Sequence, residues 1–262
     1  MEKLREFKKI VEESSNIVFF GGAGVSTESG IPDFRSTDGL YNQEYDYPPE
    51  QILSHTFFVK KPEEFYRFYR NKILIEGAEP NITHKKLAEL EAKGKVRAVI
   101  TQNIDGLHQK AGSKEVYEVH GTVAKNYCTK CGTFYSGEKV RSLIDADREV
   151  RRRKAAEEGK EWDEVHGYGL PYCSKCGAII KPDVVLYEEG LDDYIWEKSC
   201  EYIRNADVLI VGGTSLVVYP AAGLINYYKG NKLILVNRSQ TPYDSYADLV
   251  LNMGLGEVFS TV

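Results

Sequence analysis

Short runs of consecutive apolar residues recur along the chain and predict buried strands. The first is Ile17-Val18-Phe19-Phe20, and a second, Val96–Thr101, follows a helical pattern that stops at Gly94. Runs that are apolar at nearly every position are typical of strands buried on both faces, as in parallel sheets. We expect further strands at residues 116–119, 184–187, 207–211, 232–237 and 248–251.

Helical spacing of apolar residues marks the segments around these strands. Leu4, Phe7 and Val11 predict an N-terminal amphipathic helix, and further helices are expected from Pro62, from about Asn81, and over residues 192–204 and 219–229. Strands that alternate with helices predict an α/β fold with a mostly parallel, Rossmann-like, doubly wound sheet. Ligands of such sheets bind at the carboxyl ends of the strands.

Length and charge narrow the class of protein. A chain of 262 residues suits one large α/β unit with a small appendage, and its net charge of −5 comes from interspersed charges of both signs. This balance does not indicate a nucleic-acid or membrane surface, and it mildly favours basic substrates such as lysine-bearing peptides. The sequence contains no recognisable signal peptide or membrane span, so we expect a cytoplasmic protein.

Four of the five cysteines fall in two Cys-x-x-Cys pairs, each followed by glycine: Cys128/Cys131 and Cys173/Cys176. In a reducing compartment such pairs favour a metal over disulfides, and a redox motif would not need two copies. Four thiolates saturate a tetrahedral Zn²⁺, so the predicted zinc site is structural. The pairs enclose 41 residues, and a charged, solvated helix at about 137–160 accounts for the extra length. Cys200 is expected to be a buried structural thiol.

The glycine-rich segment Gly21–Arg35 begins where the first apolar run ends. A buried strand that breaks into such a turn leaves backbone N–H groups available for a phosphate, although a Gly-x-Gly alone fits a tight strand–helix turn equally well. Ser26 can add a hydroxyl, and Arg35 can add a guanidinium for a phosphate or carboxylate. The acidic ribose ligand of dehydrogenases, expected about 20 residues on, is replaced by an irregular stretch rich in Tyr and Pro. Ser215 and Asn237, at other strand ends, are alternative polar groups for ribose hydroxyls.

Two further polar groups follow predicted strands. Gln102-Asn103-Ile104-Asp105 offers an amide and a carboxylate that suit a ligand's carboxamide group, although an Asx turn or a helix cap is a common use of such residues. His120 precedes Gly121, which permits close approach, and an ordinary pKa near 6.5 suits a general base. The other histidines are expected to be hydrogen-bonded structural groups: His55, His84, His108 and His166.

In their order and spacing, these motifs resemble those of the sirtuin family, the NAD-dependent protein-lysine deacylases, and in particular its prokaryotic members. The motifs are the glycine loop fused to Ile31-Pro32-Asp33-Phe34-Arg35, the segment 102–105, Val119-His120-Gly121 and Gly213-Thr214-Ser215. The resemblance implies a deacetylase that uses NAD as co-substrate, passes the lysine acyl group to ADP-ribose and releases nicotinamide. It extends over nearly the whole chain, to Asn237-Arg238.

The same resemblance implies roles for individual residues. Asn103 and Asp105 would hold the nicotinamide and its ribose, His120 would accept a proton from a ribose hydroxyl, and Phe34 would cover the reacting face. The catalytic set is therefore His120, Asn103 and Asp105. The residues expected to bind the cofactor are Gly22, Ala23, Gly24, Ser26, Phe34, Arg35, Gln102, Asn103, Asp105, Gly213, Thr214, Ser215 and Asn237.

An extended acyl-lysine peptide would bind between residues 182–189 and 214–220 through main-chain hydrogen bonds. The first segment departs from the family, because Tyr187-Glu188-Glu189 stands where Phe-Gly-Glu is common. Sirtuins that prefer succinyl or malonyl lysine have Tyr-x-x-Arg in the helix from Pro62. Here Tyr69 stands at the arginine position, and Arg70 is one residue, or about 100°, further round the helix. We therefore expect acetyl or other uncharged acyl groups to be preferred.

The expected organisation is one sirtuin domain with two insertions. Residues 1–35, 84–125 and 178–262 would form the Rossmann-like NAD-binding domain, 36–83 a cofactor loop and helical module, and 126–177 a zinc-binding module. Two other functions stay open at this point. A mono-ADP-ribosyltransferase would use the same pocket, and a non-catalytic NAD-sensing or zinc-ribbon module would share the binding motifs.

Overall fold

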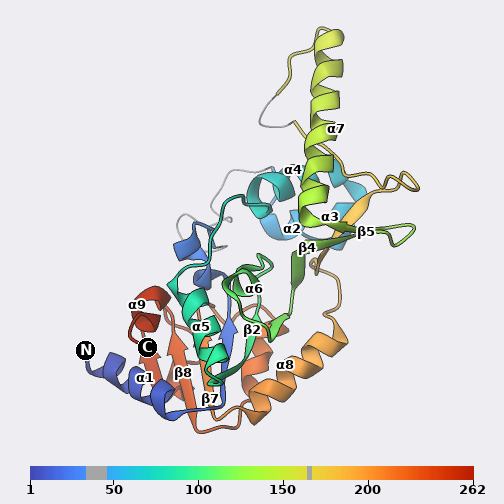
Figure 1. Ribbon diagram of the computed structural model, residues 1–262. Coiled ribbons are helices and arrows are strands. Elements are labelled where there is room, and N and C mark those ends of the chain that lie inside the picture. The colour runs from blue at the N-terminus through green and yellow to red at the C-terminus, as the bar shows by residue number, and fades with distance from the viewer. Residues whose placement is uncertain (34–45, 164–166) are drawn as a thin grey trace. The chain divides into compact units, whose positions relative to one another are not determined.

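The computed structural model describes residues 1–33, 46–163 and 167–262 (Figure 1). These residues fall into two compact units, each considered by itself. Unit 1 contains residues 1–33, 78–120 and 191–262, and unit 2 contains residues 46–77, 121–163 and 167–190. The domain boundaries expected from the sequence stay predictions.

The described residues of unit 1 contain a six-stranded sheet in which all neighbouring strands are parallel (Figure 1). The strand order is β3-β2-β1-β7-β8-β9. The strands are β1 (Ile17–Gly21), β2 (Val96–Thr101), β3 (Val116–Glu118), β7 (Val208–Gly212), β8 (Lys232–Val236) and β9 (Leu249–Leu251). Since the order reverses between β1 and β7, their carboxyl ends flank the switch point at which sheets of this kind bind ligands. The predicted Rossmann-like fold is confirmed.

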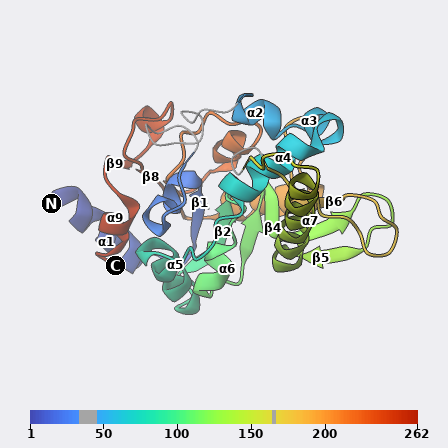
Figure 2. The same ribbon diagram turned by 90° about the horizontal axis from the view of Figure 1, so that it is seen from above.

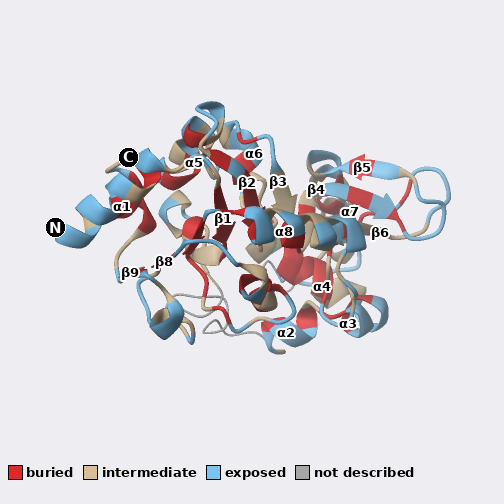
Figure 3. Ribbon diagram, turned by 90° about the horizontal axis from the view of Figure 1, so that it is seen from below, coloured by how far each residue is buried: buried red, intermediate tan, exposed pale blue. Residues whose placement is uncertain are grey.

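Helices pack against both faces of this sheet. Alternate residues of each strand face opposite sides, so each strand contributes to two core clusters. Ile17 and Phe19 pack in one core cluster with α1 (Glu2–Glu13), α5 (Ile82–Ala92) and α9 (Leu255–Phe259). Val18 and Phe20 pack in a second cluster with α8 (Asp193–Asn205) and the 3₁₀ helix η5 (Ala221–Tyr227). The central strands are coloured as buried in Figure 3. The shorter helices of unit 1 are η1 (Ala23–Val25), η2 (Thr27–Ser29), α6 (Leu107–Ala111) and η6 (Asp244–Tyr246).

Unit 2 contains an antiparallel sheet with the strand order β5-β4-β6 among its described residues. The strands are β4 (Gly121–Cys128), β5 (Phe134–Ser136) and β6 (Ile180–Val184). The prediction of a strand at 184–187 is therefore wrong, because β6 ends at Val184. Tyr187 forms an isolated bridge with Ser54 instead. Pro182 lacks an N–H group and argues against a strand, but β6 is an edge strand, where proline is tolerated.

The helices of unit 2 precede and interrupt this sheet. The long charged helix expected near 137–160 is confirmed as α7 (Gly137–Glu157), which contacts β4 and β5 (Figure 2). Ser136 caps it by accepting a hydrogen bond from the backbone N–H of Lys139. The other helices are α2 (Pro49–Ile52), α3 (His55–Lys60), α4 (Pro62–Phe68) and the π-helical turn η4 (Tyr69–Ile73).

Candidate functional site

The glycine loop follows β1 directly and lies against the turn that follows β7. Gly24 N–H donates to the Gly213 carbonyl at 2.8 Å, and Gly22 N–H donates to the Gly212 carbonyl at 3.2 Å. A Cβ atom on Gly24 would lie 2.8 Å from Gly213 Cα, and Gly213 itself has a positive φ of +62°. The backbones approach so closely that side chains are excluded at both positions. This is the compact, side-chain-free turn that a diphosphate requires.

Three polar side chains meet beside this loop. Ser26 donates its hydroxyl hydrogen to Asp105 Oδ2 at 2.7 Å and accepts a hydrogen bond from Asn103 Nδ2 at 3.0 Å. The other Asp105 oxygen accepts from the backbone N–H of Leu107 at 2.9 Å, at the start of α6. Ser26 is almost fully buried, with 1% of its surface exposed. The hydroxyl therefore fixes the orientation of both the amide and the carboxylate, and Asp105 also forms an Asx turn with Leu107.

Gln102 links the ends of β2 and β7. Its side-chain nitrogen donates to Thr214 Oγ1 at 2.9 Å, and its backbone N–H donates to the Gly21 carbonyl at 2.9 Å. The segments that end three adjacent strands, β2, β1 and β7, are therefore joined at one edge of the sheet. Asn237, after β8, donates its side-chain amide to the Ser239 carbonyl at 2.8 Å.

His120 is joined to the same edge of the sheet through its imidazole. Its Nδ1 lies 3.1 Å from the Gln102 carbonyl oxygen, an acceptor, so Nδ1 carries the proton and the unprotonated nitrogen of the neutral ring is Nε2. Burial lowers the pKa of His120 below its ordinary value, against an opposing contribution from the Gln102 carbonyl. A neutral imidazole with a basic Nε2 at neutral pH is suited to accept a proton.

Two of the predicted cofactor residues, Phe34 and Arg35, lie outside the described residues, as does His166. Ala23 begins η1 in the glycine loop, and Ser215 follows Thr214 after β7. The structure thus brings Ser26, Asn103 and Asp105 into one hydrogen-bonded group and links Gln102 to Thr214 and to His120.

A buried histidine pair, one member of which interacts electrostatically with Asp105, was not singled out from the sequence. The rings of His84 and His108 lie 4.6 Å apart, with 0% and 1% of their surfaces exposed. His84 Nδ1 accepts from the backbone N–H of Asn81 in a capping box. Among residues 1–33, 46–163 and 167–262, neither ring nitrogen of His108 has a hydrogen-bond partner, so the expectation of a hydrogen-bonded His108 is wrong.

Both rings are held neutral by their surroundings. Burial lowers the pKa of His84 to about 4, although the Asp105 carboxylate opposes the shift. Burial, with His84 as neighbour, lowers the pKa of His108 to about 3. No feature of the sequence reveals this pair, because the two residues come from α5 and α6 and meet only through packing. Cys200, by contrast, is buried as expected, and burial raises the pKa of its thiol.

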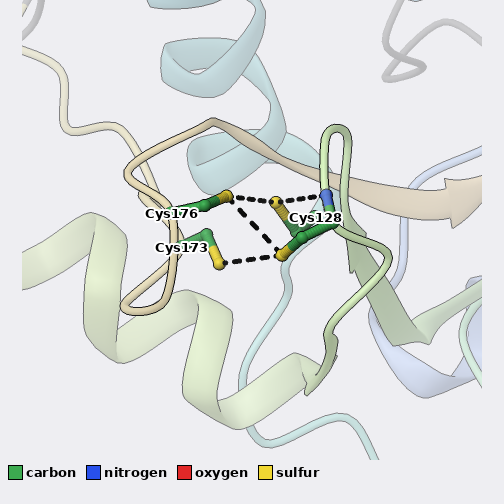
Figure 4. A group of neighbouring side chains, drawn as sticks. Cys128, Cys173 and Cys176 are labelled. Carbon is green, nitrogen blue, oxygen red and sulfur yellow. Dashed lines mark hydrogen bonds between the residues drawn. The ribbon is translucent and has the colours of Figure 1, made fainter.

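The four paired cysteines come together in unit 2 (Figure 4). Their sulfur atoms all lie within 4.8 Å of one another, and the closest separations are 3.4 Å for Cys128–Cys176, 3.5 Å for Cys131–Cys176 and 3.6 Å for Cys131–Cys173. A tetrahedral zinc ion with Zn–S bonds of about 2.3 Å separates its ligands by about 3.8 Å, so the cluster fits one Zn²⁺ with little adjustment. Four thiolates leave no position for a reacting water, so this zinc is structural.

Tyr135 supports the cluster from β5. Its hydroxyl donates to Cys173 Sγ at 3.2 Å and accepts from the backbone N–H of Ser174 at 3.0 Å. Its side chain is buried, with 7% of its surface exposed. Such hydrogen bonds to ligand atoms orient metal sites and stabilise thiolate charge.

Residues 22–220 match the model of the Sir2 family, and the chain belongs to that family. An NAD-dependent protein deacetylase of Clostridium acetobutylicum is 55% identical over 264 residues, which cover 100% of this chain and 98% of the relative. One of Clostridium perfringens with the same description is 52% identical over the same shares of both chains.

Solved structures of Sir2 proteins are also similar over nearly the full length. One, described with a deacetylated p53 peptide and 3′-O-acetyl ADP ribose, has a TM-score of 0.83 and 38% identity, covering 99% of this chain and 96% of that one. Another, described as a complex with a p53 peptide and NAD⁺, has a TM-score of 0.78 and 39% identity, with coverage of 98% and 95%. In the part of the chain that the structure describes, no helix is long and apolar enough to cross a membrane.

Proposed function

We propose that this chain is an NAD-dependent protein-lysine deacetylase, which transfers the acyl group of lysine to ADP-ribose and releases nicotinamide. The observation that carries the proposal is the full-length likeness to two proteins described as NAD-dependent protein deacetylases, at 55% and 52% identity. The geometry of unit 1 supplies the groups that the reaction needs.

Bound NAD⁺ would supply an electrophilic ribose carbon and a nicotinamide leaving group. The glycine loop would hold the diphosphate, since Gly22, Gly24 and Gly213 leave no room for side chains. Asn103 and Asp105 would hold the nicotinamide and its ribose, with their orientations set by the Ser26 hydroxyl. A polar group fixed before substrate arrives needs no reorganisation during the reaction.

His120 would act as the general base at Nε2. The Gln102 carbonyl holds the proton on Nδ1, and burial keeps the ring neutral at pH 7 by lowering its pKa. The acyl oxygen of the substrate would displace nicotinamide from the ribose carbon. His120 would then take a proton from a ribose hydroxyl, that oxygen would attack the acyl carbon, and the lysine amine would leave, with one water completing O-acyl-ADP-ribose.

The acyl-lysine peptide would bind through main-chain hydrogen bonds to residues 182–189 and to residues 214–220, as the sequence predicts. The backbone at Glu188 has a φ of +78°, in the left-handed region that favours glycine. This conformation explains why glycine is common at that position of the first segment. Here the Glu188 carboxylate accepts a hydrogen bond from the backbone N–H of Thr56 at 2.8 Å, at the start of α3. This bond offsets the strain that a non-glycine residue carries at such a φ.

An uncharged acyl group such as acetyl is the proposed preference. Arg70 forms an ion pair with Asp145 of α7, in which Nε lies 2.6 Å from Oδ1. Arg67 is almost fully buried and pairs with Glu64 at 2.6 Å. A succinyl carboxylate would have to displace one of these acidic partners to gain a cation, whereas an acetyl group requires no such exchange.

The acyl preference is tested by kcat/KM for acetyl and succinyl forms of one peptide, with the wild type and Arg70→Ala. We expect the acetyl peptide to be preferred and the Arg70→Ala ratio to match that of the wild type. A succinyl preference that disappears in Arg70→Ala would refute the proposal.

Mass spectrometry of NAD⁺ incubated with acetyl-lysine peptides tests the activity itself. A deacetylase yields nicotinamide, free lysine and O-acetyl-ADP-ribose, whereas an ADP-ribosyltransferase yields labelled protein. We expect His120→Ala to lose product formation while NAD⁺ affinity stays within a few fold, because the base acts on a later proton transfer. Lys9→Ala, which removes a side chain that is 72% exposed on α1, is the control.

We also propose a cytoplasmic location. Five cysteines without a disulfide suit a reducing compartment, in which the zinc ligands stay as thiolates. Labelling of the thiols in intact cells, followed by fractionation, tests this.

A further inference from the structure

A surface pocket of unit 1 is lined mostly by residues to which the proposed reaction gives no role; only Tyr219 and Pro220 also belong to the proposed peptide segment. Its volume is about 380 Å³, and it is lined by Trp196, Tyr219, Pro220, Gly223, Asn226 and Tyr227. Trp196 comes from α8, Tyr219 and Pro220 lie just before η5, and the other three belong to η5. Three of these six side chains are aromatic, one is a proline ring and none is charged.

Two of the aromatic side chains that line the pocket are fixed by packing. The Trp196 and Tyr227 rings pack edge to face, with centroids 6.3 Å apart and planes at 86°. Both side chains pack against the core cluster on that face of the sheet. Tyr219, by contrast, is 65% exposed. The pocket is therefore lined by two rings that pack against the core and by one exposed ring.

Two hydrogen-bond donors of the lining are unused. The Tyr243 hydroxyl donates to Asn226 Oδ1 at 3.4 Å, which leaves the amide N–H₂ group available. Within the described ranges of the chain, neither Asn226 Nδ2 nor Trp196 Nε1 has a hydrogen-bond partner. The pocket thus combines aromatic faces with N–H donors.

We propose that this pocket is a docking subsite for a proline-rich segment of the acylated substrate. A polyproline II segment presents flat ring faces and carbonyl oxygens without internal partners, and its prolines have no N–H to satisfy. Rings and N–H donors complement this surface, as in the aromatic-lined grooves that bind proline-rich peptides in other domains. A cationic ligand fits less well, because the Arg204 guanidinium lies 5.8 Å from the Tyr227 ring centroid.

The pocket adjoins the proposed peptide segment, so we assign the proline-rich ligand to the acylated substrate itself. Tyr219 and Pro220 end residues 214–220 and also line the pocket. Residues 214–220 span at most about 25 Å when fully extended, so we place the prolines within about seven residues of the acyl-lysine, on one side of it. This step rests on the proposed deacetylase function, whereas binding of a proline-rich peptide to the pocket does not.

The kinetic test uses the zinc-loaded enzyme, NAD⁺ and three acetyl-lysine peptides. One has alanine flanks, and the others carry Pro-x-x-Pro beginning about four residues before or after the acetyl-lysine. We expect one proline peptide to gain about tenfold in kcat/KM through a lower KM, with kcat unchanged. Equal kcat/KM for all three peptides would overturn the proposal.

Substitutions in the pocket lining test whether the preference for proline peptides depends on this pocket. Among the described residues, a Cβ on Gly223 meets only the Tyr219 ring at 3.9 Å, so Gly223→Ala is a mild control and Gly223→Leu fills the pocket. Gly223→Leu should abolish the proline preference while the alanine peptide keeps its kcat/KM. Trp196→Phe, which retains a ring but removes the N–H, should weaken the preference severalfold. A preference that survives Gly223→Leu would show that the prolines bind elsewhere.

A binding measurement separates this proposal from the proposed activity. A Pro-x-x-Pro peptide without any lysine is titrated into ¹⁵N-labelled protein, and the two indole N–H signals, from Trp162 and Trp196, are followed. The Trp196 signal, identified by its loss in Trp196→Phe, should shift while that of Trp162 stays. A shift produced instead by a phenylalanine peptide or by tetramethylammonium, and not by the proline peptide, would refute the docking subsite even if deacetylation is found.

Discussion

The buried histidine pair predicts an unusual loss of stability in mild acid. In the native protein the pKa values of His84 and His108 are lowered to about 4 and about 3, whereas an unfolded chain has the ordinary histidine value of about 6.5. Below pH 6.5 the unfolded state therefore binds more protons than the folded state, so the free energy of unfolding falls as the pH falls. The loss begins near pH 6.5 and continues toward the folded pKa values.

The magnitude follows from this difference in protonation. At pH 5 each histidine that is neutral when folded and protonated when unfolded costs about 2 kcal/mol, and the pair costs about 4 kcal/mol relative to pH 8. Such a loss is a large fraction of the stability of an ordinary domain. The geometry supports the figure, because both side chains are fully or almost fully buried and His108 has no hydrogen-bond partner among the described residues.

Urea unfolding at pH 8 and pH 5 measures this loss, with His84→Gln as the diagnostic variant. Glutamine cannot titrate, and its side-chain oxygen can still accept the Asn81 N–H in the capping box. The fall in unfolding free energy between the two pH values should be about 2 kcal/mol smaller in His84→Gln than in the wild type. Lys9→Gln, at a side chain that is 72% exposed, should leave the fall almost unchanged. If His84→Gln loses as much stability as the wild type, the buried pair is not the cause.

Other predictions concern the loop, the base and the metal. Gly24→Ala should weaken NAD⁺ binding at least tenfold in calorimetry, because its Cβ would lie 2.8 Å from backbone. Gly190→Ala meets nothing within 4 Å in the part of the chain that the structure describes, so it should leave affinity unchanged. The acid limb of kcat/KM against pH should have an apparent pKa below 6.5, since burial lowers the pKa of His120 and only the neutral ring can accept a proton; a limb above 6.5 would argue against this base. Chelation of zinc, or Cys173→Ala, should lower Tm by roughly 10 °C or more while Cys200→Ala does not, because several kcal/mol of ligand binding contribute to folding. An unchanged Tm after complete metal removal would contradict a structural site.

The parallel sheet was predictable from the sequence because its strands are buried on both faces. β1 and β7 are buried at every position, so they appear as apolar runs with few alternatives. β4 was not predicted, since its buried and exposed positions follow neither an alternation nor a run. β6 was placed too late because Pro182 argues against a strand until its position at a sheet edge is known.

The site residues were recognisable as motifs, but the bonds among them were not. Ser26 and Asp105 are 79 residues apart, and only the folded sheet places the hydroxyl 2.7 Å from the carboxylate. From the sequence, Ser26 was expected to face a phosphate, whereas its hydroxyl hydrogen is donated to Asp105. Long-range pairings of this kind depend on packing, for which spacing along the chain carries no signal.

The zinc cluster also affects how freely this protein can change over evolution. Cys131 and Cys173 hold both ends of a 41-residue stretch that contains α7, so the stretch returns to the same place whatever its length. Closing 41 residues rather than the 15 to 20 usual in zinc ribbons costs only about 0.7 kcal/mol more chain entropy. The metal therefore makes α7 a segment that can lengthen, shorten or change its charge while the sulfur cluster, and the sheet built around it, keep their geometry.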